Sequence, residues 1–281
     1  MYFGQNTCYW TPNGYQGSRT VWEYYFQPLI PGYSASTIPE PIRTLISADR
    51  PSANDVGGFV DDAFFVSRHF GDHPRLSGVT LPIPYQWDDP SDALRRKAKA
   101  IVDDFVRPRA YLRRKADEFF ARHMAGHHLI GVHVRGTDAT SPQERRSFRQ
   151  GSLVLPRYLQ EIDRRLSREP TAKIFVASDD QASVDHLADV FGSRVIAYES
   201  IRHRGGEPAG RGPTGWIMPA YIAGDRDTAA RNGEDAVIEY LLLSRCDHLI
   251  HNGSSLARTV LLNSPGLPHT NTHRRPDEES P

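Results

Sequence analysis

The chain has 281 residues, enough to bury a sizeable core and to hold one or two α/β domains. Its 34 Lys and Arg residues balance 34 Asp and Glu residues, so no net charge attracts nucleic acid or an anionic membrane. Two cysteines, Cys8 and Cys246, allow at most one disulfide and favour a reducing compartment. Residues 1–10 lack the basic and apolar parts of a signal peptide, and no stretch approaches the roughly 20 apolar residues of a membrane span. We therefore expect a cytoplasmic protein that binds no nucleic acid.

The first part of the chain shows little regular periodicity until two amphipathic helices. Residues 1–90 are rich in Pro, Gly, Tyr and Trp, and the best element there is 20–26, for which helix and strand are equally supported. Helices are expected at 92–105 and 108–123, the second with Pro108 in its first turn.

From residue 126 onward, expected strands alternate with expected helices. The strands are at 129–134, 173–178, 194–198 and 248–251. The helices are at 156–168, 181–191, 234–246 and 254–262, and a loop rich in Gly, Pro and Arg covers 201–224. This alternation predicts a parallel sheet covered by helices on both faces. The tail, 268–281, is polar and is expected to be disordered.

Polar residues follow three of these strands, at the edge of a parallel sheet where ligands bind. They are Arg135 and Asp138 after the first strand, Asp179 and Asp180 after the second, and Ser254 and Ser255 after the last, with His133 inside the first strand. We expect these side chains to lie close together.

The loop leading to Ser254 and Ser255 favours phosphate binding, because a helix start offers free N–H groups and partial positive charge. Arg135 could bind the same anion in a bidentate way. Ser254 also fits a plain N-cap, and His133 fits a buried, hydrogen-bonded core histidine equally well.

Acidic pairs offer only weak signals for a metal. Asp179 and Asp180 could bind one, but capping of the helix at 181–191 is the simpler interpretation. Asp225 and Asp227 match a short Asp-x-Asp pattern that can hold manganese. The chain has neither a Gly-x-x-x-x-Gly-Lys phosphate loop nor a His-Glu-x-x-His pair.

The segment at 130–138, Ile-Gly-Val-His-Val-Arg-Gly-Thr-Asp, resembles the central motif of the α1,6-fucosyltransferases. These include the rhizobial nodulation fucosyltransferases and the animal enzymes that fucosylate N-glycan cores. Segments 105–112, 176–180 and 239–255 resemble further parts of that family in the same order, and 20–28 resembles a weaker landmark. The similarity covers roughly residues 20–265.

This resemblance implies an α/β, GT-B-like architecture with two Rossmann-like domains. Residues 1–125 would form an acceptor-side domain and residues 126–267 the domain that binds the donor nucleotide. Because the chain begins after the family's first strand, the completeness of the N-terminal domain stays open. The implied reaction is inverting transfer of fucose from GDP-fucose to a hydroxyl of a glycan or small molecule, in a bacterial enzyme without metal or other cofactor. A transferase for another sugar nucleotide and a binding protein without turnover remain alternatives.

The resemblance also implies roles for individual residues. It assigns the donor β-phosphate to Arg135, the nucleotide to His133 and Glu239, further phosphate contacts to Ser254 and Ser255, and organisation of the site to Asp179 and Asp180. The family's general-base glutamate would fall at Gln143, so the candidate bases in this chain are the neighbouring Glu144 and Asp138. A carboxylate at Glu239, where the family has aspartate, could accept from guanine N1–H and N2–H₂ together. The alternative for Glu239 is an exposed helix carboxylate without a ligand.

Overall fold

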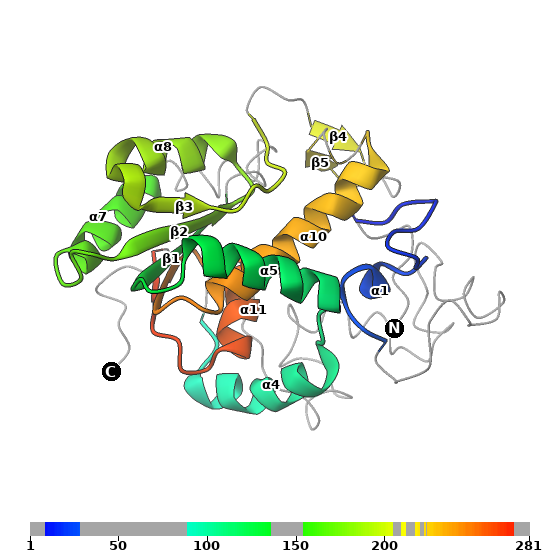
Figure 1. Cartoon of the computed structure of the whole chain (residues 1–281), viewed down its shortest axis with the longest axis horizontal. Coiled ribbons are helices and arrows are strands. Elements are labelled where there is room, and N and C mark those ends of the chain that lie inside the picture. Colours follow the sequence, from blue (N-terminus) through cyan, green and yellow to red (C-terminus); the bar gives the residue numbers. More distant parts are fainter. Residues whose placement is uncertain are drawn as a thin grey trace, which may run out of the picture.

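A parallel sheet forms the centre of the computed structural model, which describes residues 9–28, 89–135, 154–204, 209–211, 217–219, 222 and 224–272. Its strands run in the order β3-β2-β1-β6-β7, and all neighbours pair in parallel (Figure 1). Their bounds are β1 Leu129–Val134, β2 Lys173–Ser178, β3 Val195–Ala197, β6 His248–His251 and β7 His269–Asn271. The predicted α/β fold with a parallel sheet is confirmed.

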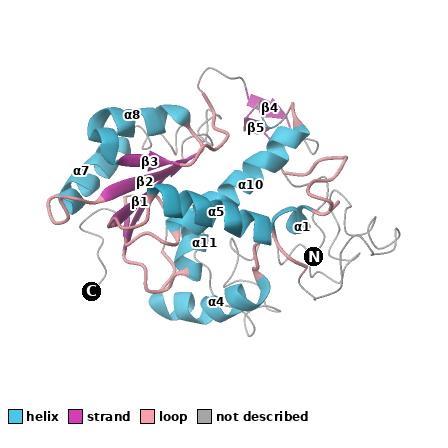
Figure 2. Ribbon diagram, viewed as in Figure 1, coloured by secondary structure: helices cyan, strands magenta, loops and turns pink. Residues whose placement is uncertain are grey.

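Helices cover both faces of this sheet (Figure 2). The helices are α1 Val21–Tyr25, α4 Asp92–Phe105, α5 Ala110–His123, α7 Val154–Leu166, α8 Gln181–Phe191, α10 Arg226–Leu243 and α11 Ser255–Asn263. On one face, α7 and α8 pack on Ile130 and Val132; on the other, α5, α10 and α11 pack on Leu129 and Phe175. Side chains alternate between faces along a strand, so a strand covered on both faces is mostly apolar; all six residues of β1 are buried, and the one polar residue, His133, is hydrogen-bonded to Ser254.

The segment at 20–26, for which helix and strand were equally supported, contains the short helix α1, which packs on α10. The Tyr25 hydroxyl donates to the Ala230 carbonyl oxygen at 2.7 Å. A Cβ at Gly233 would lie 2.3 Å from that hydroxyl oxygen, so α10 needs a glycine where α1 approaches. Helices α1 and α5 thus share a hydrophobic core with the sheet. The division into two functional domains at residue 125 stays a prediction, because residues 29–88 lie outside the described part.

Helix α4 is held to the end of α11 by a buried arginine. Arg95 is 4% exposed and donates to the carbonyl oxygens of Leu261, Ser264 and Leu267 at 3.3, 3.0 and 2.7 Å. These carbonyls lie at and beyond the end of α11, where helix carbonyls lack partners within the helix. Arg95 therefore fixes the segment that leads into β7.

Four expectations from the sequence are corrected. Helix α5 begins at Ala110 with Arg109 as its N-cap, so Pro108 precedes the helix instead of lying in its first turn. Helix α10 begins at Arg226 rather than 234, because the Asp225 side chain accepts from the Asp227 and Thr228 N–H groups and caps it. The expected loop contains an antiparallel pair, β4 Ala209–Arg211 and β5 Ile217–Pro219.

The expected disordered tail begins with the edge strand β7, whose order comes from its ladder with β6 rather than from apolar residues. The Leu249 N–H donates to the Pro268 carbonyl oxygen at 2.9 Å, and the Thr272 N–H donates to the His251 carbonyl oxygen at 2.7 Å. Residues 273–281 lie outside the described residues. No helix in the described part of the chain is long and apolar enough to cross a membrane.

Candidate functional site

The end of β1 meets the start of α11 at the carboxyl edge of the sheet. His133 Nδ1 lies 2.9 Å from Ser254 Oγ, and the two residues are 121 positions apart in the sequence. Ser254 Oγ also accepts from the Ala257 N–H at 3.2 Å, so Ser254 is the N-cap of α11. The two structural interpretations, an N-cap and a buried hydrogen-bonded histidine, are both right, and they bring the two predicted site residues together.

His133 is an uncharged imidazole at neutral pH. The pKa of His133 is lowered to about 4, mainly by burial; the negative charge of Asp179 opposes this shift and the positive charge of Arg135 adds to it. The Tyr158 hydroxyl donates to the His133 carbonyl oxygen at 2.6 Å and fixes the end of β1 from the other face of the sheet. The charges of Arg135 and Asp179 therefore both act on His133, in opposite directions, as expected for residues at the ends of neighbouring strands.

Arg135 follows β1 directly and is half-buried. It follows His133 by two residues, and the His133 side chain contacts the N-cap of α11; this edge of the sheet is suited to an anion, since a guanidinium and a helix N-terminus both attract negative charge. Ser255, the first residue of α11, is exposed. Asp138 and Glu144, the two candidate bases, lie outside the described residues.

The paired aspartates after β2 differ in what they do. Asp180 caps α8: one carboxylate oxygen accepts from the Ser183 N–H at 3.0 Å and from the Ser183 hydroxyl at 2.7 Å. The capping interpretation is therefore right for Asp180. Asp179 follows β2 directly, and its negative charge raises the pKa of both His133 and Glu239, so it acts electrostatically on both side chains.

Glu239 on α10 is buried, at 7% exposure, so the alternative of an exposed helix carboxylate is wrong. Its Oε1 accepts from Ser200 Oγ at 2.5 Å and from Arg202 Nη2 at 3.2 Å. Burial raises its pKa to about 7, against the opposing effects of Arg202 and Ser200. Burial thus makes Glu239 harder to ionise than an exposed glutamate, and a ligand that donates to it would favour the charged form.

Arg202 was not singled out in the sequence, where it is one of several arginines in the loop after β3. Besides pairing with Glu239, it donates to the carbonyl oxygens of Ser178 and Tyr198 at 3.1 and 2.6 Å. It therefore holds the ends of β2 and β3 to α10.

The Asp-x-Asp pattern forms the start of α10. Asp225 caps the helix, and Asp227 accepts from the Thr11 hydroxyl at 3.1 Å. These contacts account for both side chains without a metal ion.

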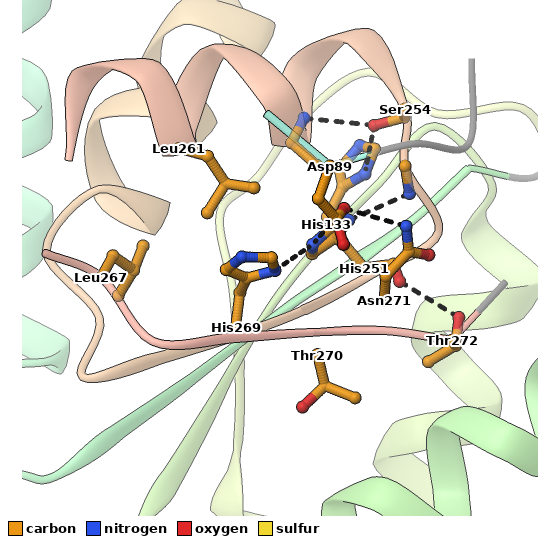
Figure 3. A network of polar contacts seen from close by, with 12 residues as sticks. Asp89, His133, His251, Ser254, Leu261, Leu267, His269, Thr270, Asn271 and Thr272 are labelled. Atoms are coloured by element: carbon orange, nitrogen blue, oxygen red, sulfur yellow. Dashed lines mark hydrogen bonds and ion pairs between the residues drawn. The ribbon is translucent and has the colours of Figure 1, made fainter. Parts of the chain in front are cut away.

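A second cluster, which the sequence did not indicate, joins Asp89, His251 and His269 behind the β6–α11 loop (Figure 3). His251 Nε2 lies 3.0 Å from His269 Nδ1 and 3.7 Å from Asp89 Oδ1. Such a grouping could hold a cation, but the Gly253 N–H donates to His251 Nδ1 at 2.9 Å. A neutral His251 therefore carries its proton on Nε2, the nitrogen that a metal would need. We interpret this group, called the His251 cluster below, as a hydrogen-bonded one.

No family model and no curated protein matches the chain. Solved structures similar to it include fucosyltransferases. The fucosyltransferase NodZ from Bradyrhizobium has a TM-score of 0.36 and 22% identity, with 55% of this chain and 42% of that one covered. POFUT1 in complex with GDP-fucose has a TM-score of 0.38 and 12% identity, with 78% and 59% covered. The chain thus spans less than half the length of NodZ, and TM-scores this low carry no argument about its activity.

Asn252, just before the start of α11, has a side-chain oxygen that finds no hydrogen-bond partner in the described part of the chain. Asn252 is 4% exposed, and its Oδ1 accepts no hydrogen bond there. A buried acceptor without a donor costs stability, so Asn252 is suited to a donor supplied from outside the described segments.

Taken together, the carboxyl edge of the sheet carries the start of α11, the guanidinium of Arg135, the neutral imidazole of His133 and the carboxylates of Asp179 and Glu239.

Proposed function

We propose that the chain is a glycosyltransferase that transfers fucose from GDP-fucose to a hydroxyl of a glycan or small-molecule acceptor, with inversion at the sugar carbon. The observation that carries this proposal is the contact between His133 and Ser254. It joins the segment resembling the central fucosyltransferase motif to the serine loop that resembles the end of the donor site. The two segments are far apart in sequence and meet where a parallel sheet binds its ligands.

In this proposal the donor diphosphate lies at the start of α11, beside Arg135. The helix dipole, the N–H groups of its first turn and the guanidinium together stabilise the leaving GDP, so the reaction needs no metal ion. Asp138 or Glu144 would deprotonate the acceptor hydroxyl on the opposite side of the sugar.

Glu239 is the proposed guanine contact. Its Oε1 already accepts from Ser200 and Arg202, so guanine would donate mainly to the other oxygen. We propose that the negative charge of Asp179 holds His133 and Arg135 in place. Asp180 acts indirectly, by fixing the start of α8.

Calorimetric titration with GDP, UDP and ADP tests the donor. We expect GDP to bind at least tenfold more tightly than the other two, a difference of about 1.4 kcal/mol. Equal affinities would leave a transferase of unknown donor. Slow release of GDP from GDP-fucose without acceptor would distinguish an enzyme from a binding protein, which binds the donor but does not cleave it. The cytoplasmic location and the acceptor remain predictions.

A further inference from the structure

The side chain of His251 forms a hydrogen bond with the backbone of the loop between β6 and α11. His251 is fully buried, and its Nδ1 accepts from the Gly253 N–H at 2.9 Å. Gly253 has a φ of 75°, in the left-handed region that favours glycine. This turn directs the chain from the end of β6 into Ser254, the N-cap of α11. The orientation of the helix start therefore depends on a turn that the His251 side chain closes.

The hydrogen bonds of the two ring nitrogens define the tautomer of His251. Since Nδ1 accepts, the proton of a neutral His251 is on Nε2, where His269 Nδ1 at 3.0 Å can accept it. The Asp89 carboxylate, 3.7 Å from the same Nε2, is too far for a hydrogen bond, but its charge favours this tautomer. Asp89 is itself anchored, because Asn271 Nδ2 donates to it at 2.9 Å.

We propose that His251 is a positioning residue of the donor site, which holds the Gly253 turn so that the start of α11 faces the donor diphosphate. The identity of the ligand rests on the function proposed above. The His251 cluster links the segment before α4, the strands β6 and β7 and the β6–α11 loop, as Figure 3 shows. His269 and Asp89 hold the tautomer, and His251 holds the turn.

Two substitutions separate the two nitrogens of His251. In His251→Asn the Oδ1 atom occupies about the place of Nδ1 and can still accept from Gly253, while the contact with His269 is lost. In His251→Gln the longer amide reaches the place of Nε2, and the acceptor for Gly253 is lost. Both variants remove a buried ring from the same site, so they share the cost of an altered core.

The experiment measures amide hydrogen exchange at Gly253 by NMR and the affinity for GDP by calorimetry, in the full-length protein. We expect His251→Asn to keep the exchange rate at Gly253 and the GDP affinity within about threefold of wild type. In His251→Gln the amide of Gly253 should exchange at least about tenfold faster, and the GDP affinity should fall by at least about tenfold. His248→Gln is the matched control. His248 is also a buried histidine of β6, but it lies at the other end of the strand, with Nε2 3.0 Å from Thr270 Oγ1. It should lower the melting temperature without changing either readout.

Equal exchange at Gly253 in the two His251 variants would overturn the inference, as would an unchanged GDP affinity in His251→Gln when its turn has opened. If the wild-type protein does not bind GDP, the proposed function is contradicted instead. The same series is then titrated with inorganic pyrophosphate. Loss of pyrophosphate affinity in His251→Gln alone would support the positioning role, and equal affinities in all four proteins would overturn it.

Discussion

His133 Nδ1 and Ser254 Oγ lie 2.9 Å apart, so one hydroxyl both caps α11 and satisfies the imidazole at the end of β1. Ser254→Ala should therefore cost more than an ordinary cap. We expect a loss of about 2–3 kcal/mol in the free energy of unfolding, since a cap is worth about 1 kcal/mol and an unsatisfied buried group costs about 1–3 kcal/mol. Urea denaturation measures it, with Ser255→Ala, an exposed position on the same turn, as the control. Equal losses in the two variants would contradict the shared role of Ser254.

Arg135→Ala should slow turnover strongly and leave the fold intact, because the side chain is half-buried after the end of a strand. The loss of a charge-assisted contact to the leaving group should cost about 3 kcal/mol of transition-state stabilisation, or about a hundredfold in rate. GDP release from GDP-fucose measures the rate, and the melting temperature monitors folding. Arg113→Ala, at an exposed position on α5, is the control. A wild-type rate in Arg135→Ala would place the phosphate site elsewhere.

Discrimination between GDP and UDP should depend on pH through Glu239. Its folded-state pKa is about 7, and guanine would bind the ionised form. The ratio of GDP affinity to UDP affinity should rise by up to about tenfold between about pH 6 and about pH 8, as the ionised fraction grows. The phosphates of the two nucleotides titrate alike, so the ratio cancels them. Glu239→Gln should make the ratio small and independent of pH. A pH-dependent ratio that persists in this variant would exclude Glu239 as the guanine contact.

Activity should survive chelation. Asp225 and Asp227 are engaged at the start of α10, and His251 presents a proton where a metal would bind. The proposed site instead stabilises the leaving diphosphate with Arg135 and the start of α11. Rates measured after incubation with EDTA and gel filtration should match those of the untreated enzyme. Full inhibition that manganese reverses would contradict this mechanism.

Much of the sheet could be predicted because its inner strands are buried on both faces. The bounds of β1, β2 and β6 agree with the structure, since each has a short apolar centre that ends in polar residues, a pattern typical of a buried strand in an α/β chain. The start of α10 was missed, because the turn from Arg226 is polar and its burial against α1 is a tertiary contact. The strand β7 was missed because His-Thr-Asn has no apolar pattern, and its order comes from pairing with β6.

Residues of the candidate site could be predicted only where a general rule of protein architecture says where a given sequence position lies in the fold. Parallel strands end at one edge, so His133, Asp179 and Ser254 could be expected together. Arg202 could not, because nothing in an arginine-rich loop indicates which guanidinium turns inward to Glu239. Asp89 and His251 come from distant segments without a shared motif, and their proximity depends on how α4 and β7 pack.

The strand β7 changes what truncation of the tail should do. A chain ending at Leu267 loses the ladder with β6, the Thr272 contacts with the His251 carbonyl oxygen and the partner of His251 Nε2. At about 1 kcal/mol for each buried hydrogen bond lost, its free energy of unfolding should fall by about 3 kcal/mol or more.

A chain ending at Thr272 should keep the stability of the full-length protein, because residues 273–281 are polar except for two prolines and offer little to bury. Urea denaturation of the two truncated proteins beside the full-length chain measures the difference. Because the shorter chain also removes His269, it should bind GDP more weakly, whereas the longer one should bind it as the full-length protein does. Equal stability of the two truncated proteins would mean that β7 contributes nothing to the fold, and the His251 cluster would then have to be held by β6 and the segment at Asp89 alone.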